Sequence, residues 1–432
     1  MNKFLAWLEK NLAGPMARLS EQRHLLAIRD GVISALPFII VGSFFLIAAF
    51  PPVPEKWAIA VWAKEHIAQI LIPYRLTMFI MSLYISFGIG HNLAKSYGLD
   101  PLSGGQMAAG ALLLTIIPQA IDGSWYLPMT YLGGQGLFGT MIVSIIAVEI
   151  LRFFKTKNLT IKMPEQVPQS VYRSFESLFP VAFLILLMTL ISVVFHLDIH
   201  ELIGKAIEPI IKVGDSLFGV LIPVFLTAFF WAFGIHGDSI VGTVARPVWE
   251  VYIAKNAEAV ASGSQHLPHI APEPFFQWFV SIGGTGATIG LVLAVLIFGR
   301  SKYLRTVAKA SFFPGLFNIN EPVIFGMPIV LNPLLMIPFV IIPIVNAVIA
   351  YVVMSIGWVS PPYVLAPWTL PGPIGSFLAT GGDLGAVVLN IVNIAIALLI
   401  YMPFMKVYDR QMLKAEQEEV SETSIKNQNL TV

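Results

Sequence analysis

The sequence predicts an all-α polytopic membrane protein of about ten transmembrane helices, with re-entrant hairpins and an interfacial amphipathic helix. Hydrophobic residues make up 56% of the 432 residues and charged residues only 12%, whereas an ordinary soluble domain is about one quarter charged. The mean hydropathy is +0.77, as expected of a chain whose exterior meets lipid. Apolar stretches long enough to cross the hydrocarbon core, which takes about 20 residues, recur along the whole chain.

The same composition excludes several classes of function. The formal net charge of +1 provides no concentrated basic face for nucleic acid. The chain contains no cysteine, so it has no disulfide, no thiolate nucleophile and no cysteine metal ligand. No GxxxxGK[ST] loop, GxSxG elbow or HExxH helix occurs. An ATP-driven pump formed by this chain alone is therefore not expected, and no cofactor is predicted.

The first 26 residues predict a helix that lies along the membrane surface. Charged residues interrupt the segment throughout, which argues against a cleavable signal peptide. Its apolar residues recur at helical spacing and are Phe4, Leu5, Leu8, Leu12, Met16 and Leu19. We interpret this segment as an amphipathic interfacial helix, with the first helix of a soluble domain as the alternative.

Nine segments are apolar and long enough to be membrane-spanning helices. They cover residues 31–50, 76–94, 104–121, 131–151, 178–197, 216–235, 275–298, 329–355 and 384–405. Several contain glycine or proline, which membrane helices tolerate when neighbouring groups satisfy the freed backbone. The sequence after Tyr408 is polar and predicts a short, solvent-exposed cytoplasmic tail over residues 409–432.

Charge bias in the loops sets the predicted orientation and adds a tenth crossing. Lysine and arginine concentrate in residues 1–26, 152–175 and 299–310 and are absent from residues 118–130. The first three segments are therefore predicted to be cytoplasmic and the last to be external. Nine crossings would place 299–310 outside. A further span over 238–261 makes the number of crossings before residues 299–310 even, which returns that segment to the cytoplasmic side. This span requires that protein shields its charged side chains from lipid. With ten crossings both termini are cytoplasmic.

Two segments, 311–328 and 356–383, are apolar but broken by proline and glycine. Non-helical backbone at membrane depth is tolerated where protein buries it or where it lines a cavity. We therefore expect re-entrant hairpins in both segments, and a third within 262–285. Interrupted segments of this kind indicate a transport site, and all three fall in the C-terminal half.

Residues 198–215 alternate apolar and charged side chains at helical spacing, which predicts an amphipathic interfacial helix that links two halves. The predicted N-terminal transmembrane domain has five spans and covers residues 1–197. The linker helix is followed by a C-terminal transmembrane domain over 216–408, which carries the broken segments and hence the expected binding site. The polar tail over 409–432 completes the predicted organisation.

Two ionisable residues inside apolar segments are candidates for that site, since such groups are costly in a membrane and are usually functional. His236 lies in WAFGIHGDS and is followed by Gly237, and a glycine beside a polar group lets a ligand approach the backbone closely. Glu321 lies in FNINEPVIFG beside Asn320. Its carboxylate can accept hydrogen bonds from hydroxyl groups of a ligand, and an asparagine can both donate and accept.

Other interpretations of these polar residues stay open. Taken alone, His236 is as compatible with a structural histidine as with a ligand-binding one. Trp368 can stack on the face of a ligand or anchor at the membrane interface. His266, His269 and Glu273 in HLPHIAPEP suggest a metal site, but the intervening prolines break the helical spacing that aligns such ligands. A polar lining of the third hairpin is the favoured interpretation, and no metal is predicted.

The chain resembles a known family of membrane proteins over nearly its whole length. The similarity is carried by RDGVISALPFIIVGS, GIHGDS, HIAPEPFFQWFVSIGGTGAT, FNINEPVIFGMPIVLNP and APWTLPGPIGSFLATGGD. These segments resemble the IIC permeases of the lactose, cellobiose and diacetylchitobiose class of bacterial sugar phosphotransferase systems. The NINEP segment with the following IFGMPIVLNP is highly specific for this class, whereas GIHG alone would not be.

The resemblance implies a homodimer of ten-span subunits in the lipid of the bacterial plasma membrane, with the N-terminal spans forming most of the dimer contact. It implies that the sugar lies in the C-terminal half, between re-entrant hairpins. It also implies that His236 and Glu321 lie near the 6-hydroxyl of the sugar, as catalytic and substrate-binding residues. Gly237, Asn320 and Trp368 carry over as substrate-binding residues.

Proteins of this family phosphorylate the sugar on the cytoplasmic side as they transport it. The resemblance implies a phosphocysteine on a IIB protein as the donor, with IIA and HPr upstream. Because this chain lacks cysteine, we expect IIB to be a separate protein and the chain to be a transport subunit rather than an enzyme by itself. Cellobiose or N,N'-diacetylchitobiose is favoured over lactose, because lactose permeases are often fused to IIB.

Two other functions compete with that of a phosphotransferase-system permease. A proton-coupled secondary sugar transporter would use Glu321 and His236 as a proton relay, and transport of unmodified sugar driven by a pH gradient alone would identify it. A membrane sugar receptor is disfavoured, because the sequence holds no substantial cytoplasmic output domain.

Overall fold

The computed structural model describes residues 21–161, 175–264 and 266–429. The chain forms two compact units. The first comprises the residues up to Asp215 together with Gly242–Pro272 and Tyr363–Leu365, and the second comprises Ser216–Val241, Glu273–Pro362 and the residues from Ala366 onward. The interfacial helix predicted over residues 1–26 lies almost entirely outside the described residues.

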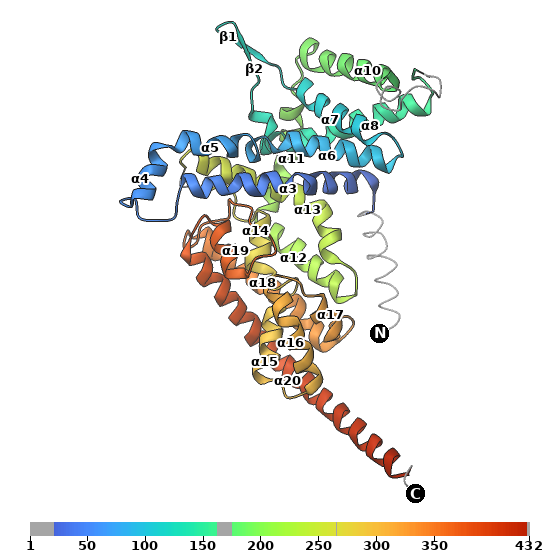
Figure 1. Ribbon diagram of the computed structural model, residues 1–432, viewed down its shortest axis with the longest axis vertical. Helices are drawn as coiled ribbons and strands as arrows, with labels where there is room; N and C mark the ends of the chain where they lie inside the picture. Colours follow the sequence, from blue (N-terminus) through green and yellow to red (C-terminus); the bar gives the residue numbers. More distant parts are fainter. Residues whose placement is uncertain (1–20, 162–174, 265, 430–432) are drawn as a thin grey trace. The chain divides into compact units, whose positions relative to one another are not determined.

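The first unit consists of helices and one small hairpin (Figure 1). Its α-helices are α3 (Arg23–Ala49), α4 (Ala58–Glu65), α5 (Ile67–Arg75), α6 (Met81–Ser96), α7 (Pro101–Leu114), α8 (Leu137–Thr156), α10 (Leu178–Thr189), α11 (Ile199–Gly214) and most of α13 (Gly237–Ala261). Short 3₁₀ and π turns are η2 (Met78–Ile80), η3 (Thr130–Leu132), η4 (Gly134–Gly136) and η5 (Leu190–Val194). Strands β1 (Gln119–Ile121) and β2 (Ser124–Tyr126) pair antiparallel, with Ala120 opposite Trp125.

Glycine lets three helices of the first unit pack backbone against backbone. Helix α6 packs on both α3 and α7. A Cβ added to Gly88 would lie 2.9 Å from the Cα of Gly31, and one added to Gly90 would lie 2.3 Å from the carbonyl oxygen of Gly104. Small residues of this kind are how membrane helices approach closely, because lipid supplies no hydrophobic drive for their association.

All the regular elements of the second unit within the described residues are helices, joined by irregular segments (Figure 1). Its elements are α12 (Leu217–Ala232), the first residues of α13, α14 (Glu273–Phe275), the π-helix η6 (Phe276–Val280), α15 (Ile289–Phe298), α16 (Lys302–Leu316), α17 (Glu321–Gly326), α18 (Pro333–Ser355), α19 (Gly372–Ala379) and α20 (Leu384–Asn429). Helix α20 packs against α15, α18 and α19. Val292, Ile324, Phe339 and Tyr401 are among the fully buried residues of this core.

The continuous span predicted over 275–298 is wrong. The chain forms η6 and then an irregular turn before α15 begins, because Gly283, Gly284 and Gly286 all have left-handed φ angles. Helix α20 supplies partners for the freed backbone. Asn390 and Asn393 donate to the carbonyls of Trp278 and Phe279 at 2.6 and 2.8 Å, and the Tyr401 hydroxyl donates to Gly286 at 2.8 Å. Irregular backbone at membrane depth needs such protein partners.

The all-α polytopic class is confirmed. Among the described residues, five helical stretches are long and apolar enough to cross a membrane, namely Arg23–Ala49, Ile67–Ser96, Gly134–Thr156, Pro333–Ser355 and Leu384–Glu418. The pair Leu178–Val194 and Ile199–Gly214, bent by 79°, adds a sixth if it counts as one span. Helices α12 and α15 are apolar but shorter. The total of ten crossings stays a prediction.

Three predicted boundaries differ from the structure. The helix predicted over 104–121 ends at Leu114, because the chain turns into the β-hairpin from Gln119. The loop predicted over 299–310 is mostly the start of α16, and the tail predicted after Tyr408 continues α20 to Asn429. The last two differences share a cause. Asp409 of α20 accepts from the amides of Arg300 and Ser301 just before α16, and Glu416 of α20 accepts from the Tyr303 amide in its first turn, so the two charged segments hold each other.

The broken segments are irregular in the structure. Helix α16 ends at Leu316 and the short α17 begins at Glu321, so the 311–328 segment contains a break. Most of 356–383 is non-helical until α19, and 262–272 is non-helical until α14. Helix α11 (Ile199–Gly214) occupies the segment predicted as a helix over 198–215, and its interfacial linking role stays a prediction. The insertion of these segments into the membrane as re-entrant hairpins stays a prediction.

Candidate functional site

The turn that carries His236 lies between α12 and α13. Gly234 has a φ of +80°, which lets the chain reverse after α12. The Ser239 amide donates to Nδ1 of His236 at 3.2 Å, and Ser239 Oγ lies 3.0 Å from the same nitrogen. Since Nδ1 accepts, the neutral ring carries its proton on Nε2 and can donate from there. His236 is exposed, and its ring lies 4.4 Å from that of Trp231.

Gly237 begins α13 in close contact with the backbone of α12. A Cβ added at this position would lie 2.1 Å from the carbonyl oxygen of Thr227. The space beside Gly237 is therefore filled by protein, and a larger residue would displace the turn that holds His236.

Asp238 joins the His236 turn to a distant part of the second unit. Its Oδ2 accepts a hydrogen bond from Trp231 Nε1 at 2.6 Å and another from Thr285 Oγ1 at 2.7 Å. The carbonyl of Thr285 in turn accepts from Nδ2 of Asn320 at 2.8 Å. Trp231, Asp238, Thr285 and Asn320 thus form a continuous hydrogen-bonded chain. It leads from the residue that packs on His236 to the residue before Glu321.

The NINEP segment fills the break between α16 and α17. Asn318 has a left-handed φ of 62°. Its side chain accepts from the Gly283 amide at 2.9 Å and donates to the carbonyls of Trp368 and Leu370 at 2.8 and 3.1 Å. Asn320 is 5% exposed. Glu321, by contrast, is exposed at the first position of α17.

The glycine turn before α15 packs directly against this segment. A Cβ on Gly284, whose φ is +94°, would lie 2.3 Å from Cγ of Asn320. Trp368 is 53% exposed, and its backbone is held by Asn318. The structure therefore brings the GGTG turn, NINEP and the Trp368 segment together, and the Asp238 chain adds the His236 turn. Among the described residues no hydrogen bond joins His236 directly to Glu321.

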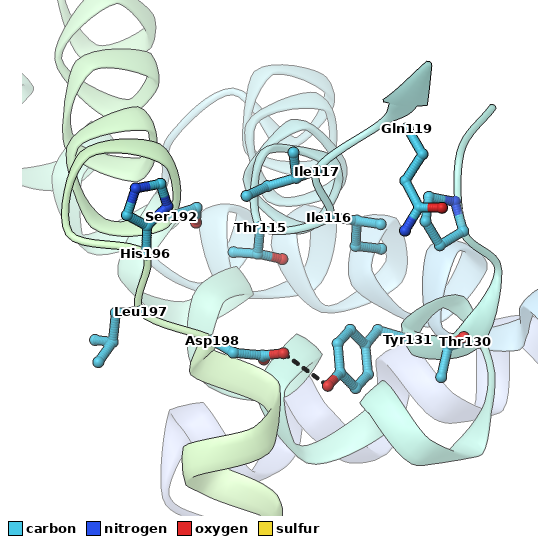
Figure 2. Close-up of a pocket in the computed structure, with 11 residues that line it drawn as sticks. Thr115, Ile116, Ile117, Gln119, Thr130, Tyr131, Ser192, His196, Leu197 and Asp198 are labelled. Atoms are coloured by element: carbon cyan, nitrogen blue, oxygen red, sulfur yellow. Dashed lines mark hydrogen bonds between the residues drawn. The ribbon is translucent and has the colours of Figure 1, made fainter. Parts of the chain in front are cut away.

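The first unit contains a separate cavity of about 340 Å³ that none of the predicted site residues lines (Figure 2). Figure 2 shows Tyr131 donating to Asp198, at 2.7 Å, between the hairpin and the start of α11. The pair therefore closes one side of the cavity.

The histidines of HLPHIAPEP have structural contacts in the first unit. Nδ1 of His269 lies 3.1 Å from Oδ2 of Asp215, and the ring stacks on Tyr252 at 4.5 Å. Asp215 Oδ1 also accepts from the amides of Ile270 and Ala271, both at 3.0 Å. Within the described ranges no group of three His, Asp or Glu side chains is arranged to hold a metal ion.

Sequence reasoning missed Asp238, Trp231 and Thr285 as residues that organise the site. Asp238 stands in the GIHGDS segment, and Thr285 stands in the SIGGTGAT run, so both lay inside segments already singled out. Their hydrogen bond joins positions 47 residues apart. The available signal was a carboxylate next to Gly237 in an otherwise apolar stretch.

The chain was compared with known proteins. The family model "Phosphotransferase system, EIIC" matches residues 29–343. A cellobiose-specific EIIC component of Geobacillus stearothermophilus is 39% identical, with 97% of each chain covered. A lichenan permease IIC component of Bacillus subtilis is 38% identical, with 97% of this chain and 96% of the relative covered.

A solved structure has the same fold. It is that of the transporter ChbC, the IIC component from the N,N'-diacetylchitobiose-specific phosphotransferase system, and it matches with a TM-score of 0.88 at 38% sequence identity. The match covers 95% of this chain and 99% of that one. A family match over most of the chain, relatives of this identity and a shared multi-pass fold agree with the sequence motifs. The chain therefore belongs to the EIIC family of sugar permeases of the phosphotransferase system.

Proposed function

We propose that this permease binds a β-linked disaccharide and presents its 6-hydroxyl to a separate, phosphorylated IIB protein. Cellobiose and N,N'-diacetylchitobiose are the proposed substrates, with lactose less favoured. The names of the relatives support this choice, since one is a cellobiose-specific component and another comes from an N,N'-diacetylchitobiose-specific system. The absence of cysteine from this chain supports a donor on another protein.

The hydrogen-bonded chain from Trp231 through Asp238 and Thr285 to Asn320 is the observation that carries the proposal. It couples the turn of His236 to the segment of Glu321, which are 85 positions apart in sequence (321 minus 236). Both side chains are exposed at the ends of this chain. A ligand that spans them would meet a histidine donor on one side and a carboxylate acceptor on the other.

Each proposed residue has a distinct role. Glu321 accepts a hydrogen bond from the 6-hydroxyl, and Nε2–H of His236 donates to a sugar oxygen. The exposed ring of Trp368 stacks on a sugar face. Asn320 donates from its side-chain nitrogen to the carbonyl of Thr285, and its side-chain oxygen accepts a hydrogen bond from the sugar. Gly237 keeps the His236 turn close to α12, and the backbone of this turn then lies beside the ligand.

The proposed phosphoryl transfer requires only the sugar, the phosphocysteine of IIB and a base, and no cofactor. The oxygen of the 6-hydroxyl attacks the phosphorus of the IIB phosphocysteine. A P–O bond forms as the P–S bond breaks, the hydroxyl proton passes to Glu321, and the thiolate stays on IIB. Catalysis of phosphoryl transfer rests mainly on positioning and charge stabilisation, and a positioned carboxylate can serve as the general base.

The proposal is tested with the full chain in proteoliposomes. Cellobiose or N,N'-diacetylchitobiose is supplied outside, and purified phosphorylated IIB of a cellobiose-specific system is supplied inside. We expect phosphorylated sugar to accumulate only when phosphorylated IIB is present. Uphill accumulation of unmodified sugar driven by a pH gradient alone would identify a proton-coupled transporter and overturn the proposal. Two cytoplasmic termini and a homodimer form part of the same proposal.

A further inference from the structure

Two carboxylates of α20 cap the start of α16. Asp409 accepts from the amides of Arg300 and Ser301 at 2.9 and 2.8 Å, and it is 5% exposed. Glu416 accepts from the Ser301 hydroxyl at 2.7 Å and from the Tyr303 amide at 2.9 Å. The first amides of a helix have no partner within the helix, so the bond from Tyr303 satisfies one of them, while Asp409 holds the two residues that precede α16. Asp409 is thereby held in a buried position, whereas Glu416 stays partly exposed with its oxygens occupied by these hydrogen bonds.

Seven basic side chains are exposed around this cap, with Glu418 as an exposed acid further along α20. We name as the basic surface the exposed residues Arg300, Lys302, Arg305, Lys309, Lys406, Arg410 and Lys414. The last three recur at every fourth position of α20 and so share one helix face. Lys406 Nζ lies 5.4 Å from the ring of Phe298, the last residue of α15. Residues 299–310 contain no acid, and residues 405–414 contain only the buried Asp409.

The basic surface is linked to the helix that begins with Glu321. The Tyr303 hydroxyl donates to the carbonyl of Gly326, the last residue of α17, at 2.8 Å. Helix α17 has six residues, which corresponds to about 9 Å at the usual helical rise. A protein seated on the start of α16 would therefore reach the neighbourhood of Glu321.

We propose that the basic surface is the docking site for the phosphorylated IIB protein. This inference rests on the proposed function and names the surface that serves it. A phosphoryl group brings nearly two negative charges at neutral pH. The seven exposed cations, four of which stand on or just before the helix that packs against α17, attract such a partner and orient it, because complementary charge mainly raises the rate of association. Burial of Asp409 withdraws that negative charge from the basic surface, and hydrogen bonds from Ser301 and Tyr303 engage the carboxylate of Glu416.

The test uses full-length chain in proteoliposomes with purified phosphorylated IIB of a cellobiose-specific system. Two double variants, R305Q/K309Q and R410Q/K414Q, leave the capping carboxylates intact. We expect each to raise the KM for phosphorylated IIB by about fivefold, with a weaker dependence on salt, as neutralised rim charges do. The maximal rate and the sugar Kd measured by calorimetry should stay unchanged. K95Q/K157Q is the matched control, which neutralises two exposed lysines of the first unit.

Three outcomes would overturn the proposal. One is an unchanged KM for IIB in both double variants. Another is a larger effect in K95Q/K157Q, which would move the docking site to the first unit. The third is a defect that disappears when anionic lipid is replaced by zwitterionic lipid, which would assign the basic surface to lipid headgroups. If the wild-type chain phosphorylates no sugar, the proposed function has failed, and direct binding of phosphorylated IIB to the same vesicles still tests the surface.

Discussion

At the residue scale, His236 is positioned by neighbours on both sides of its turn. Ser239 engages Nδ1 from the start of α13, while Trp231 packs against the ring from the end of α12. Trp231 is itself held by Asp238, which also holds Thr285. A functional side chain needs supporting residues of this kind to keep one orientation. The exposed edge of the ring, at Nε2, is the part left for a ligand.

Glu321→Gln is expected to lower the rate of sugar phosphorylation by about 10²- to 10³-fold, since general-base catalysis contributes about this much. The glutamine keeps the size of the side chain and one acceptor oxygen. The fold change in the sugar Kd should therefore be no larger than the fold change in the rate. The rate is measured with phosphorylated IIB in proteoliposomes. Glu208→Gln, at a fully exposed surface pair, serves as the control. Full turnover in Glu321→Gln would remove this residue from the mechanism.

His236→Ala is expected to weaken sugar binding by about tenfold, the upper end of what one hydrogen bond contributes. Calorimetry on the purified protein measures the Kd. His196→Ala is the matched control, because His196 is also exposed but lines the cavity of the first unit. Equal Kd values for the His236 variant and the wild type would contradict the proposed role, and a defect confined to the His196 variant would move the site to that cavity.

Asp238→Ala leaves the Trp231 indole and the Thr285 hydroxyl without their acceptor. Leaving buried donors unsatisfied costs about 1–3 kcal/mol each, so we expect a lower Tm and weaker sugar binding. Asp238→Asn retains an acceptor oxygen and should restore much of both. A purely structural role predicts that only the Tm changes. Loss of sugar affinity at a temperature far below the Tm identifies Asp238 as a positioning residue.

The sequence offers candidate residues for the site but not the hydrogen bonds that connect them. His236 and Glu321 stand out because charged or ionisable groups are rare in apolar segments. Their link through Asp238, Thr285 and Asn320 depends on residues that are far apart in the chain, and no local pattern encodes such a pairing. The exposed Trp368 was equally compatible with an interface anchor. Its backbone contact with Asn318 was not predictable from either interpretation.

At the element scale, charge density was a poor guide to where helices end. Residues 299–310 are rich in lysine and arginine, and they were predicted as a loop for that reason. The carboxylates of α20 stabilise them as the first turns of α16 instead. The GG sequence in 281–288 has the opposite effect, because left-handed glycines end η6 inside an apolar run that was predicted to be continuous.

Asp409→Ala removes the acceptor for the amides of Arg300 and Ser301. Because both amides then lose their protein partner, we expect a destabilisation of about 1–3 kcal/mol, as for a lost cap or an unsatisfied polar group. Thermal unfolding of the detergent-solubilised chain measures it, and the sugar Kd should be unaffected. Glu418→Ala removes an exposed carboxylate of the same helix and is the control. Equal Tm values for the two variants would contradict the capping role.

At the scale of the whole molecule, the chain crosses between its two units more than once. Residues 242–272 and 363–365 belong to the first unit although they lie in the C-terminal half of the sequence. Hydropathy and charge identify spans one at a time, so they predicted two consecutive halves. The grouping of these segments with N-terminal helices depends on packing partners that composition does not specify.

The molecular mass of the protein in detergent tests the proposed homodimer. The chain is 47.4 kDa, and multi-angle light scattering with the detergent contribution subtracted should give twice that value. Dilution in detergent should leave the mass unchanged if the apolar contact between subunits is extensive. A single-chain mass at all concentrations would contradict the dimer. The sugar phosphorylation assay on the same sample then shows whether activity follows the dimer.

The length of helix α20 would turn a small tilt at one end into a large displacement at the other. The helix runs for 46 residues, which is about 69 Å at the helical rise, more than twice the roughly 30 Å of a hydrocarbon core. Its first part is tied to the backbone of η6 by Asn390 and Asn393. A tilt of about 10° at that end would sweep the far end through roughly 12 Å, given the length of the rod. Since the chain contains no cysteine, a single one introduced near Glu418 would carry a donor dye, and acceptor dyes on lipid headgroups would report each tilt as a change in energy transfer.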